Sequence, residues 1–228
     1  MTIAQDLEGY QVESIIKSIE SLPSDLGSQE PSLESYLHLQ QLVLLMKCLD
    51  WLWQDRDDYF AAGNLTIYYS RNRKKNEDFR GPDFFVVLNT EHKPRKSWMI
   101  WEEEGKYPNV IIELLSDSTA NIDRGAKKQI YQDTFRTPEY FWFHPDTLEF
   151  QGFELIRGKY QPIQANESGL IWSEQLQLFL GTHENQLRFF TADQKLTPTP
   201  EEFAAEVQAK NERLAAKLRE LNIDPDTL

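Results

Sequence analysis

The segment NVIIELL, residues 109–115, is almost entirely apolar and carries one charged residue, Glu113. A short apolar run of this kind, with no polar alternation, is typical of a strand covered on both faces. An ionised carboxylate in such a strand is unfavourable unless a cation or hydrogen-bond donors accompany it. The segment therefore predicts a buried strand whose glutamate has a function. A solvated strand face is the alternative, and the apolar neighbours of Glu113 disfavour it.

A second carboxylate stands at the start of another apolar segment. In GPDFFVVLNT, residues 81–90, Asp83 follows a turn pair and directly precedes FFVVL. A local explanation exists, because Asp in a turn accepts hydrogen bonds from nearby amides. Two carboxylates at strand positions also suggest a shared partner. With no His or Cys beside them, they suit a hard cation such as Mg²⁺, with Mn²⁺ as a substitute.

A cationic side chain is useful beside such carboxylates, and the following segment supplies two. Lys127 and Lys128 lie in DRGAKKQIYQDTF, residues 123–135, whose apolar residues follow a helical period. Neighbours on a helix diverge by about 100°, so one of the two lysines must point away. Lys127 lies one turn before Tyr131, which is expected to face the core, and we expect Lys127 to reach the carboxylates. A solvated lysine pair is the ordinary alternative.

The rest of the chain predicts an α/β (or α+β) fold, with a mixed central sheet flanked by helices. A long helix is expected from after Pro31 to about Leu52, because apolar residues recur at intervals of three and four residues. Its periodic residues include Leu33, Leu37, Val43 and Leu44. Strand composition marks residues 65–70, 83–88, 97–101, 109–115 and 140–143. Alternating residues from Leu148 to Phe190 predict antiparallel hairpins with one wet face.

Three stretches are expected along the chain. Residues 1–31 form an N-terminal extension and linker, residues 32–190 the globular domain, and residues 191–228 a C-terminal helical tail. Positions of a possible helical seam recur in the tail at intervals of four and three residues: Val207, Asn211, Leu214, Leu218 and Leu221. This spacing predicts either a short coiled-coil seam or a helix packed onto the domain.

Composition and charge bound the function. No run near 18 apolar residues and no secretory signal occurs, so the cytoplasm is the expected location, without a membrane partner. Cys48 lies in an apolar run and is expected to be buried, and the four histidines lack the spacing of a zinc site. The net charge of −13 argues against nucleic acid. Residues 71–136, however, hold 13 Lys and Arg against 11 Asp and Glu, which is compatible with a phosphodiester substrate.

Four segments in order, GPDFFVV, NVIIELLSDST, DRGAKKQIYQ and TPEYFWFHP, resemble the Uma family of predicted restriction endonucleases. That family is a bacterial branch of the PD-(D/E)XK nuclease superfamily, and the resemblance runs from about Leu33 to Leu180. It implies a restriction-endonuclease-like core and Mg²⁺-dependent hydrolysis of phosphodiester bonds, with DNA as the expected nucleic acid. It also implies a homodimer, because nucleases of this fold commonly dimerise. The C-terminal seam is one candidate interface, and the β-hairpin region is another.

The resemblance assigns roles to four residues. It makes Asp83 and Glu113 the metal-binding acids and the backbone carbonyl of Leu114 a further metal ligand. Lys127 matches a lysine that the family carries on the helix, where it would orient the attacking water or stabilise developing charge. The expected catalytic set is therefore Asp83, Glu113 and Lys127.

Two departures from the superfamily pattern accompany this assignment. Leu115 stands where the superfamily commonly has a lysine, a departure that the family shares. His144 stands where the family commonly has Asp, and we expect it to affect a turn. The alternative function is a non-catalytic interaction or nucleic-acid-binding module that retains the nuclease fold. The acidic flanks favour that alternative, whereas the intact catalytic set disfavours it.

Other charged residues have ordinary explanations. Asp123 is expected to form a helix ion pair with Lys127 or to cap the helix, and it is left out of the catalytic set. Glu34 is expected to be solvent-exposed. The loop with Arg71, Arg73, Lys74 and Lys75 either binds phosphates or keeps the loop soluble.

Overall fold

The computed structural model describes residues 35–70, 79–116, 120–221 and 224–225. These residues fall into two compact units, one of which holds residues 65–70, 79–81 and 94–106. That unit contains a three-stranded sheet in the order β3 (Phe79–Arg80), β2 (Ile67–Tyr68) and β5 (Trp98–Met99). The strands predicted at 65–70 and 97–101 are therefore present but shorter. The predicted domain boundaries after residues 31 and 190 stay predictions.

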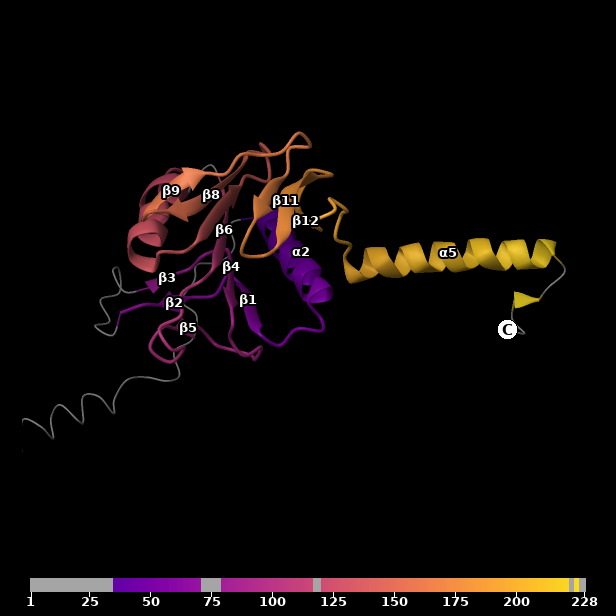
Figure 1. The fold of residues 1–228 in the computed structure, drawn as a ribbon, viewed down its shortest axis with the longest axis horizontal. Coiled ribbons are helices and arrows are strands. Elements are labelled where there is room, and N and C mark those ends of the chain that lie inside the picture. The colour runs from indigo at the N-terminus through magenta and orange to yellow at the C-terminus, as the bar shows by residue number, and fades with distance from the viewer. Residues whose placement is uncertain (1–34, 71–78, 117–119, 222–223, 226–228) are drawn as a thin grey trace, which may run out of the picture. The chain divides into compact units, whose positions relative to one another are not determined.

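The second unit is built on a six-stranded sheet in the order β1-β4-β6-β7-β8-β9 (Figure 1). Its strands are β1 (Tyr59–Gly63), β4 (Phe84–Leu88), β6 (Val110–Leu114), β7 (Glu139–Phe143), β8 (Phe150–Ile156) and β9 (Lys159–Pro162). Only β6 and β7 pair in parallel; the other pairs of this sheet are antiparallel. The sheet is mixed, as predicted. β1 was not predicted, because Ala61, Ala62 and Gly63 are depleted in strands, and its pairing with β4 makes it a strand.

A helical crossover joins the parallel strands β6 and β7, as parallel pairing requires. It consists of α3 (Ala120–Ile122), η1 (Asp123–Lys127), α4 (Lys128–Ile130) and η2 (Tyr131–Phe135). The crossover ends at Arg136, whose φ of 53° lies in the left-handed region. Residue 137 precedes a proline and is therefore disfavoured in a helix. The predicted helix over 123–135 is confirmed.

The helix predicted to end near Leu52 is α2 (Tyr36–Leu52), capped by the Ser35 side chain, which accepts from the His38 N–H at 3.2 Å. Of the periodic residues that predicted the helix, Leu37 and Val43 are exposed, whereas Leu44 packs against the core. The buried residues of α2 are His38, Gln41, Leu42, Leu45, Cys48 and Leu49. The polar Gln41 can be buried because its amide donates to the Leu187 carbonyl and accepts from the Leu187 N–H, each at 2.9 Å.

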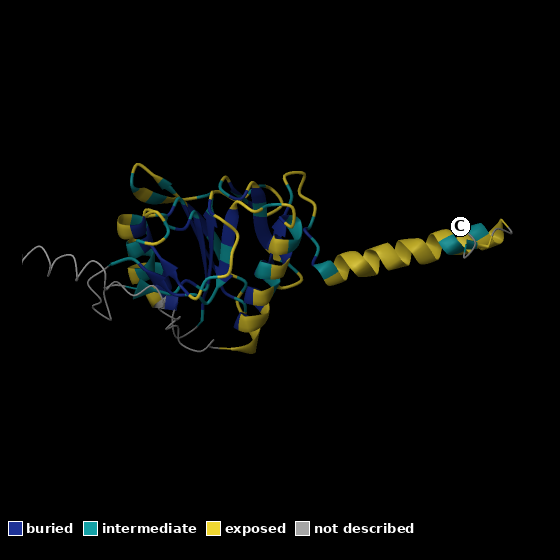
Figure 2. Ribbon diagram, turned by 90° about the horizontal axis from the view of Figure 1, so that it is seen from below, coloured by how far each residue is buried: buried dark blue, intermediate teal, exposed yellow. Residues whose placement is uncertain are grey.

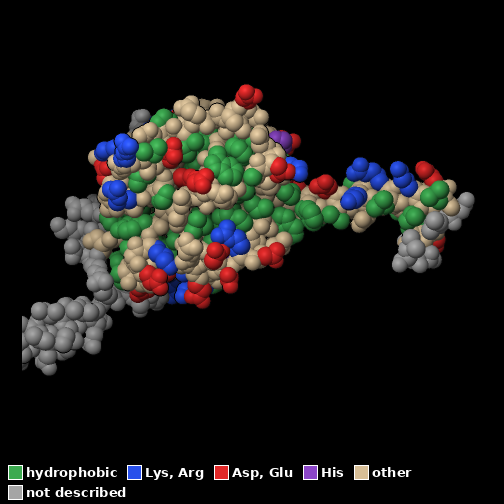
Figure 3. Space-filling view, in the orientation of Figure 1, with side chains coloured by type: hydrophobic (Ala, Val, Ile, Leu, Met, Phe, Trp, Pro, Cys, Tyr) green, Lys and Arg blue, Asp and Glu red, His purple; other side chains and the backbone are tan. Residues whose placement is uncertain are grey.

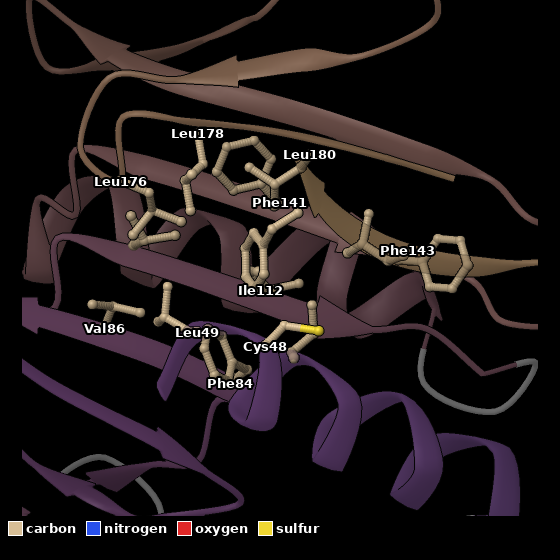
Figure 4. Close-up of a cluster of buried hydrophobic side chains, with 14 of the residues drawn as sticks. Cys48, Leu49, Phe84, Val86, Ile112, Phe141, Phe143, Leu176, Leu178 and Leu180 are labelled. Carbon is tan, nitrogen blue, oxygen red and sulfur yellow. The ribbon is translucent and has the colours of Figure 1, made fainter. Parts of the chain in front are cut away.

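A second sheet completes the unit, with β10 (Ile171–Ser173), β11 (Leu178–His183) and β12 (Gln186–Phe190) paired antiparallel. The predicted hairpins over 148–190 are confirmed. A core of apolar side chains joins α2 to both sheets, and Figure 4 shows part of it. Its members include Cys48, Leu49, Phe84, Ile112, Phe141, Phe143, Leu178 and Leu180. Cys48 is buried as expected, and burial raises the pKa of its thiol.

The last described helix, α5 (Pro200–Glu220), begins with a capping box in which Thr199 and Glu202 exchange hydrogen bonds. Its first turn contacts the rest of the second unit, to which α5 belongs, through the Lys47–Glu201 and Arg188–Glu202 ion pairs. None of its residues is buried, and Figure 2 shows it almost wholly exposed. Packing along the domain, one of the two predicted fates, is therefore limited to its start. Within the described residues, no helix is long and apolar enough to cross a membrane.

Candidate active site

The two predicted carboxylates meet where β4 begins and β6 ends. In the antiparallel register Phe84 pairs with Ile112, so the residues next to them, Asp83 and Glu113, lie side by side. The Leu114 N–H donates to Asp83 Oδ2 at 2.7 Å, and the Asp83 N–H donates to Glu113 Oε2 at 3.3 Å. The Asp83 carboxylate is thus held by a residue 31 positions away, not by a local turn.

The crossover helix brings Lys127 and Tyr131 to Glu113, and Asp123 to Lys127. Lys127 Nζ lies 3.1 Å from Glu113 Oε2 and 2.8 Å from Asp123 Oδ1. The Tyr131 hydroxyl donates to Glu113 Oε1 at 2.6 Å. Asp123, Lys127 and Tyr131 are spaced by four residues, which places them on one face of the helix.

Two wide turns shape this helix. The Lys128 N–H donates to the Asp123 carbonyl, and the Arg136 N–H donates to the Tyr131 carbonyl, in each case five residues earlier. Hydrogen bonds of this span define π-helical turns, which occur frequently at functional sites. The first turn begins at Asp123 and the second at Tyr131, and both residues lie on the helix face that carries Lys127.

Burial dominates the electrostatics of the site. Glu113 has no exposed surface, and desolvation raises the pKa of its carboxyl to about 7, although the Lys127 charge lowers it. Desolvation also raises the pKa of Asp83. For Lys127, desolvation alone lowers the pKa, but Glu113, Asp123 and Asp83 outweigh it and raise the pKa above its usual value. Lys127 therefore stays charged at neutral pH.

The Leu114 carbonyl, predicted as a metal ligand, has a protein partner. His38 Nε2 lies 2.6 Å from this oxygen, and the His38 side chain is buried in the first turns of α2. A carbonyl oxygen has two lone pairs, so one contact leaves it able to accept another. His38 thereby fixes the position of the end of β6.

The residues fit a divalent cation by charge. When Asp83, Glu113 and Asp123 are ionised, Lys127 supplies one positive charge for three negative ones, an excess that a divalent cation would balance. No cluster of three or more His, Cys, Asp or Glu side chains suited to a metal occurs in the described ranges. The protein ligands would therefore be the carboxylates of Asp83 and Glu113 and the Leu114 carbonyl, with water completing the set, as Mg²⁺ tolerates.

Every predicted site residue thus lies in one cluster, while their chemical roles stay predictions. Sequence reasoning missed that Asp123 is a buried member of the cluster. Only 1% of it is exposed, and its pair with Lys127 is not a surface pair. It also missed Tyr131 and His38. The spacing of Asp123, Lys127 and Tyr131 by four was a usable signal, whereas no local pattern singles out His38.

The two residues that depart from the family and superfamily patterns, Leu115 and His144, are both buried. Leu115, in the usual lysine position, is fully buried. His144 accepts from the Asp146 and Thr147 N–H groups at 3.3 and 3.4 Å, so it stabilises a turn, as expected. Glu34 and the basic loop at 71–75 lie outside the described residues.

A family profile described as "Uma2: Putative restriction endonuclease" matches residues 29–189. The chain belongs to the Uma2 family. Among solved structures, this Uma2 chain is similar to a protein from Anabaena variabilis described as "a putative nuclease", at 12% identity and a TM-score of 0.47. The similarity covers 65% of this chain and 77% of that one. No curated protein matches the chain.

Proposed function

We propose that this Uma2 chain is a Mg²⁺-dependent endonuclease that hydrolyses phosphodiester bonds in DNA. The observation that carries the proposal is the fully buried Glu113, which contacts Lys127 and lies beside Asp83 at the ends of two paired strands. A buried carboxylate pair with a charged lysine costs stability, and such costs concentrate at functional sites. Family membership points to the same activity.

Asp83, Glu113 and the Leu114 carbonyl would hold the cation. When bound, Mg²⁺ would neutralise charge that develops on the phosphodiester and promote attack by water. The protein's own part is positional and electrostatic. Hydrogen bonds from Leu114 and Asp83 amides align the two carboxylates before substrate arrives.

Lys127 would act as a fixed positive charge. Its raised pKa keeps the ammonium protonated, so it can donate to the attacking water or to a phosphate oxygen but cannot accept a proton at neutral pH. The lysine reaches this place from the crossover helix, which explains how the site tolerates Leu115 in the usual lysine position.

The test is cleavage of supercoiled, linear and single-stranded DNA and of RNA with Mg²⁺ or Mn²⁺. We expect Asp83→Ala, Glu113→Ala and Lys127→Ala each to lower the cleavage rate at least about 100-fold. Asp133→Ala is the matched control, since Asp133 is an exposed acid on the same crossover. Cleavage that persists in the three variants would assign the activity elsewhere. A wild-type protein that cleaves none of these substrates would favour the non-catalytic module.

We also propose that the protein is a homodimer that pairs through α5. Figure 3 shows hydrophobic side chains along this helix, and Phe203, Val207, Leu214 and Leu221 are exposed. Its charges are segregated, with Glu201, Glu202 and Glu206 in the first half and four of six charged residues basic in the second. Glu201 and Glu202 pair with Lys47 and Arg188 of their own chain, and a second copy in antiparallel orientation would add basic residues of its second half beside this acidic half. Such a pair also covers the apolar stripe.

Light scattering after size exclusion tests the dimer. We expect the wild type to have twice the chain mass and Leu214→Glu to be monomeric. Ala216→Glu, on the opposite side of α5, should stay dimeric. A monomeric wild type, or a dimeric Leu214→Glu protein, would exclude α5 as the interface.

A further inference from the structure

We infer that Tyr131 is a positioning residue that holds the Glu113 carboxylate with Oε2 directed toward Asp83 and Lys127. Its hydroxyl donates to Glu113 Oε1 at 2.6 Å, and neither side chain has exposed surface. This inference rests on the proposed metal-dependent function, for which it adds a residue outside the predicted catalytic set.

The two oxygens of Glu113 have different surroundings. Oε2 lies 3.1 Å from Lys127 Nζ and accepts from the Asp83 N–H at 3.3 Å, so it is the oxygen on the side of the carboxylate pair. Oε1 is turned the other way, to the hydroxyl of Tyr131. A carboxylate rotates easily about its last bond unless both oxygens are engaged. The Tyr131 bond therefore selects one orientation.

Packing alone does not account for a tyrosine here. The Tyr131 ring packs against Phe135 and Tyr140, with ring centroids 5.4 and 5.5 Å apart, and a phenylalanine ring would make the same contacts. A hydroxyl adds the cost of burying a polar group, which its hydrogen bond to Glu113 offsets. What the hydroxyl adds over phenylalanine is this bond.

The backbone places the hydroxyl within reach. Tyr131 is one turn beyond Lys127, and the π-helical turn from Tyr131 to Phe135 begins at this residue. Lys127 and Tyr131 thus approach Glu113 from adjacent turns and engage different oxygens. Groups that orient metal ligands in this way commonly contribute 10–100-fold to metal affinity.

Tyr131→Phe tests the inference, with Tyr160→Phe as the matched control. The Tyr160 hydroxyl also donates a partly buried hydrogen bond, but to the Thr137 backbone carbonyl at 2.9 Å and not to a carboxylate. Calorimetry with Mn²⁺ alone measures affinity without substrate, and thermal unfolding checks that both variants fold. We expect Tyr131→Phe to weaken Mn²⁺ binding about 10–100-fold and Tyr160→Phe to change it less than about threefold.

Cleavage as a function of Mn²⁺ concentration gives an independent readout. Activity of Tyr131→Phe should recover at high Mn²⁺, whereas Lys127→Ala should stay inactive, because Tyr131 acts on metal binding and Lys127 on the reaction. If Tyr131→Phe binds Mn²⁺ as tightly as the wild type, the inference is wrong while the proposed function stands. If the wild type binds no Mn²⁺, the metal-dependent function fails and this inference fails with it.

Discussion

The two faces of the central strand β6 are equally buried but differ in chemistry. Along β6, Ile112 and Leu114 belong to the apolar core shared with α2, whereas Glu113 between them contacts Lys127 and Tyr131 of the crossover. All three residues are at most 1% exposed. Burial alone therefore does not distinguish a core from a site. The difference lies in the donors that the covering helix presents: α2 offers mostly apolar side chains to the core, and the crossover offers an ammonium and a hydroxyl.

The largest effect on stability should come from the apolar face. Leu49→Ala removes a fully buried side chain from the core and should lower the free energy of unfolding by about 2–5 kcal/mol. Denaturant unfolding measures this change. Leu37→Ala, at a 47% exposed position on the same helix, should change it by less than about 0.5 kcal/mol. Equal losses in the two variants would contradict the assignment of the buried face of α2.

The burial of Glu113 on the other face of β6 should make the free energy of unfolding depend on pH when no metal is bound. Burial raises the Glu113 pKa to about 7, above its usual value of 4.5, so the folded state binds more protons between these values. This contribution is fully present below pH 4.5 and is lost as the pH rises through 7. Relative to Glu113→Gln, the wild type should lose up to about 3 kcal/mol between acidic pH and pH ~8. Chemical unfolding with chelator measures the difference, and parallel pH profiles would refute a costly buried charge.

A glycine on the apolar face should resist substitution. A Cβ at Gly152 would lie 2.6 Å from Phe141 Cε1 and 3.1 Å from Ile171 Cγ2, both core side chains. Gly152→Ala should therefore destabilise the fold by about 1–3 kcal/mol through overpacking. Thermal or denaturant unfolding checks this value. A neutral effect would mean that the core beneath β8 is looser than its contacts indicate.

The smallest effect, with the opposite sign, should come from the crossover that covers the polar face. A Cβ at Gly125 would meet no atom within 4 Å, and this residue is exposed in a helical turn. Gly125→Ala should stabilise the protein by about 0.5–1 kcal/mol, because alanine loses less backbone freedom on folding. Unfolding beside Gly152→Ala gives the comparison directly. Destabilisation at both positions would show that the π-helical turn requires glycine.

Local pattern was enough for the central strands and for part of the site. The apolar runs at 83–88 and 109–115 identified β4 and β6, and the acids in them marked Asp83 and Glu113. The helical period of 123–135 identified the crossover, and the sequence alone indicated that its lysines could reach the carboxylates. These features depend on residues close in sequence, whose spacing directly states which face they share.

Only the tertiary structure showed that His38, Gln41 and Asp123 lie inside. His38 and Gln41 occupy the buried face of α2 because their partners, the Leu114 carbonyl and the Leu187 backbone, are 76 and 146 residues away. Asp123 differs, because its partner Lys127 is four residues away on the same crossover; the sequence did not show that this pair lies against Glu113 of β6. β1 forms a strand through its pairing with β4. A polar group is stable inside a protein when it is paired, and the period of a single segment does not show a partner on another one.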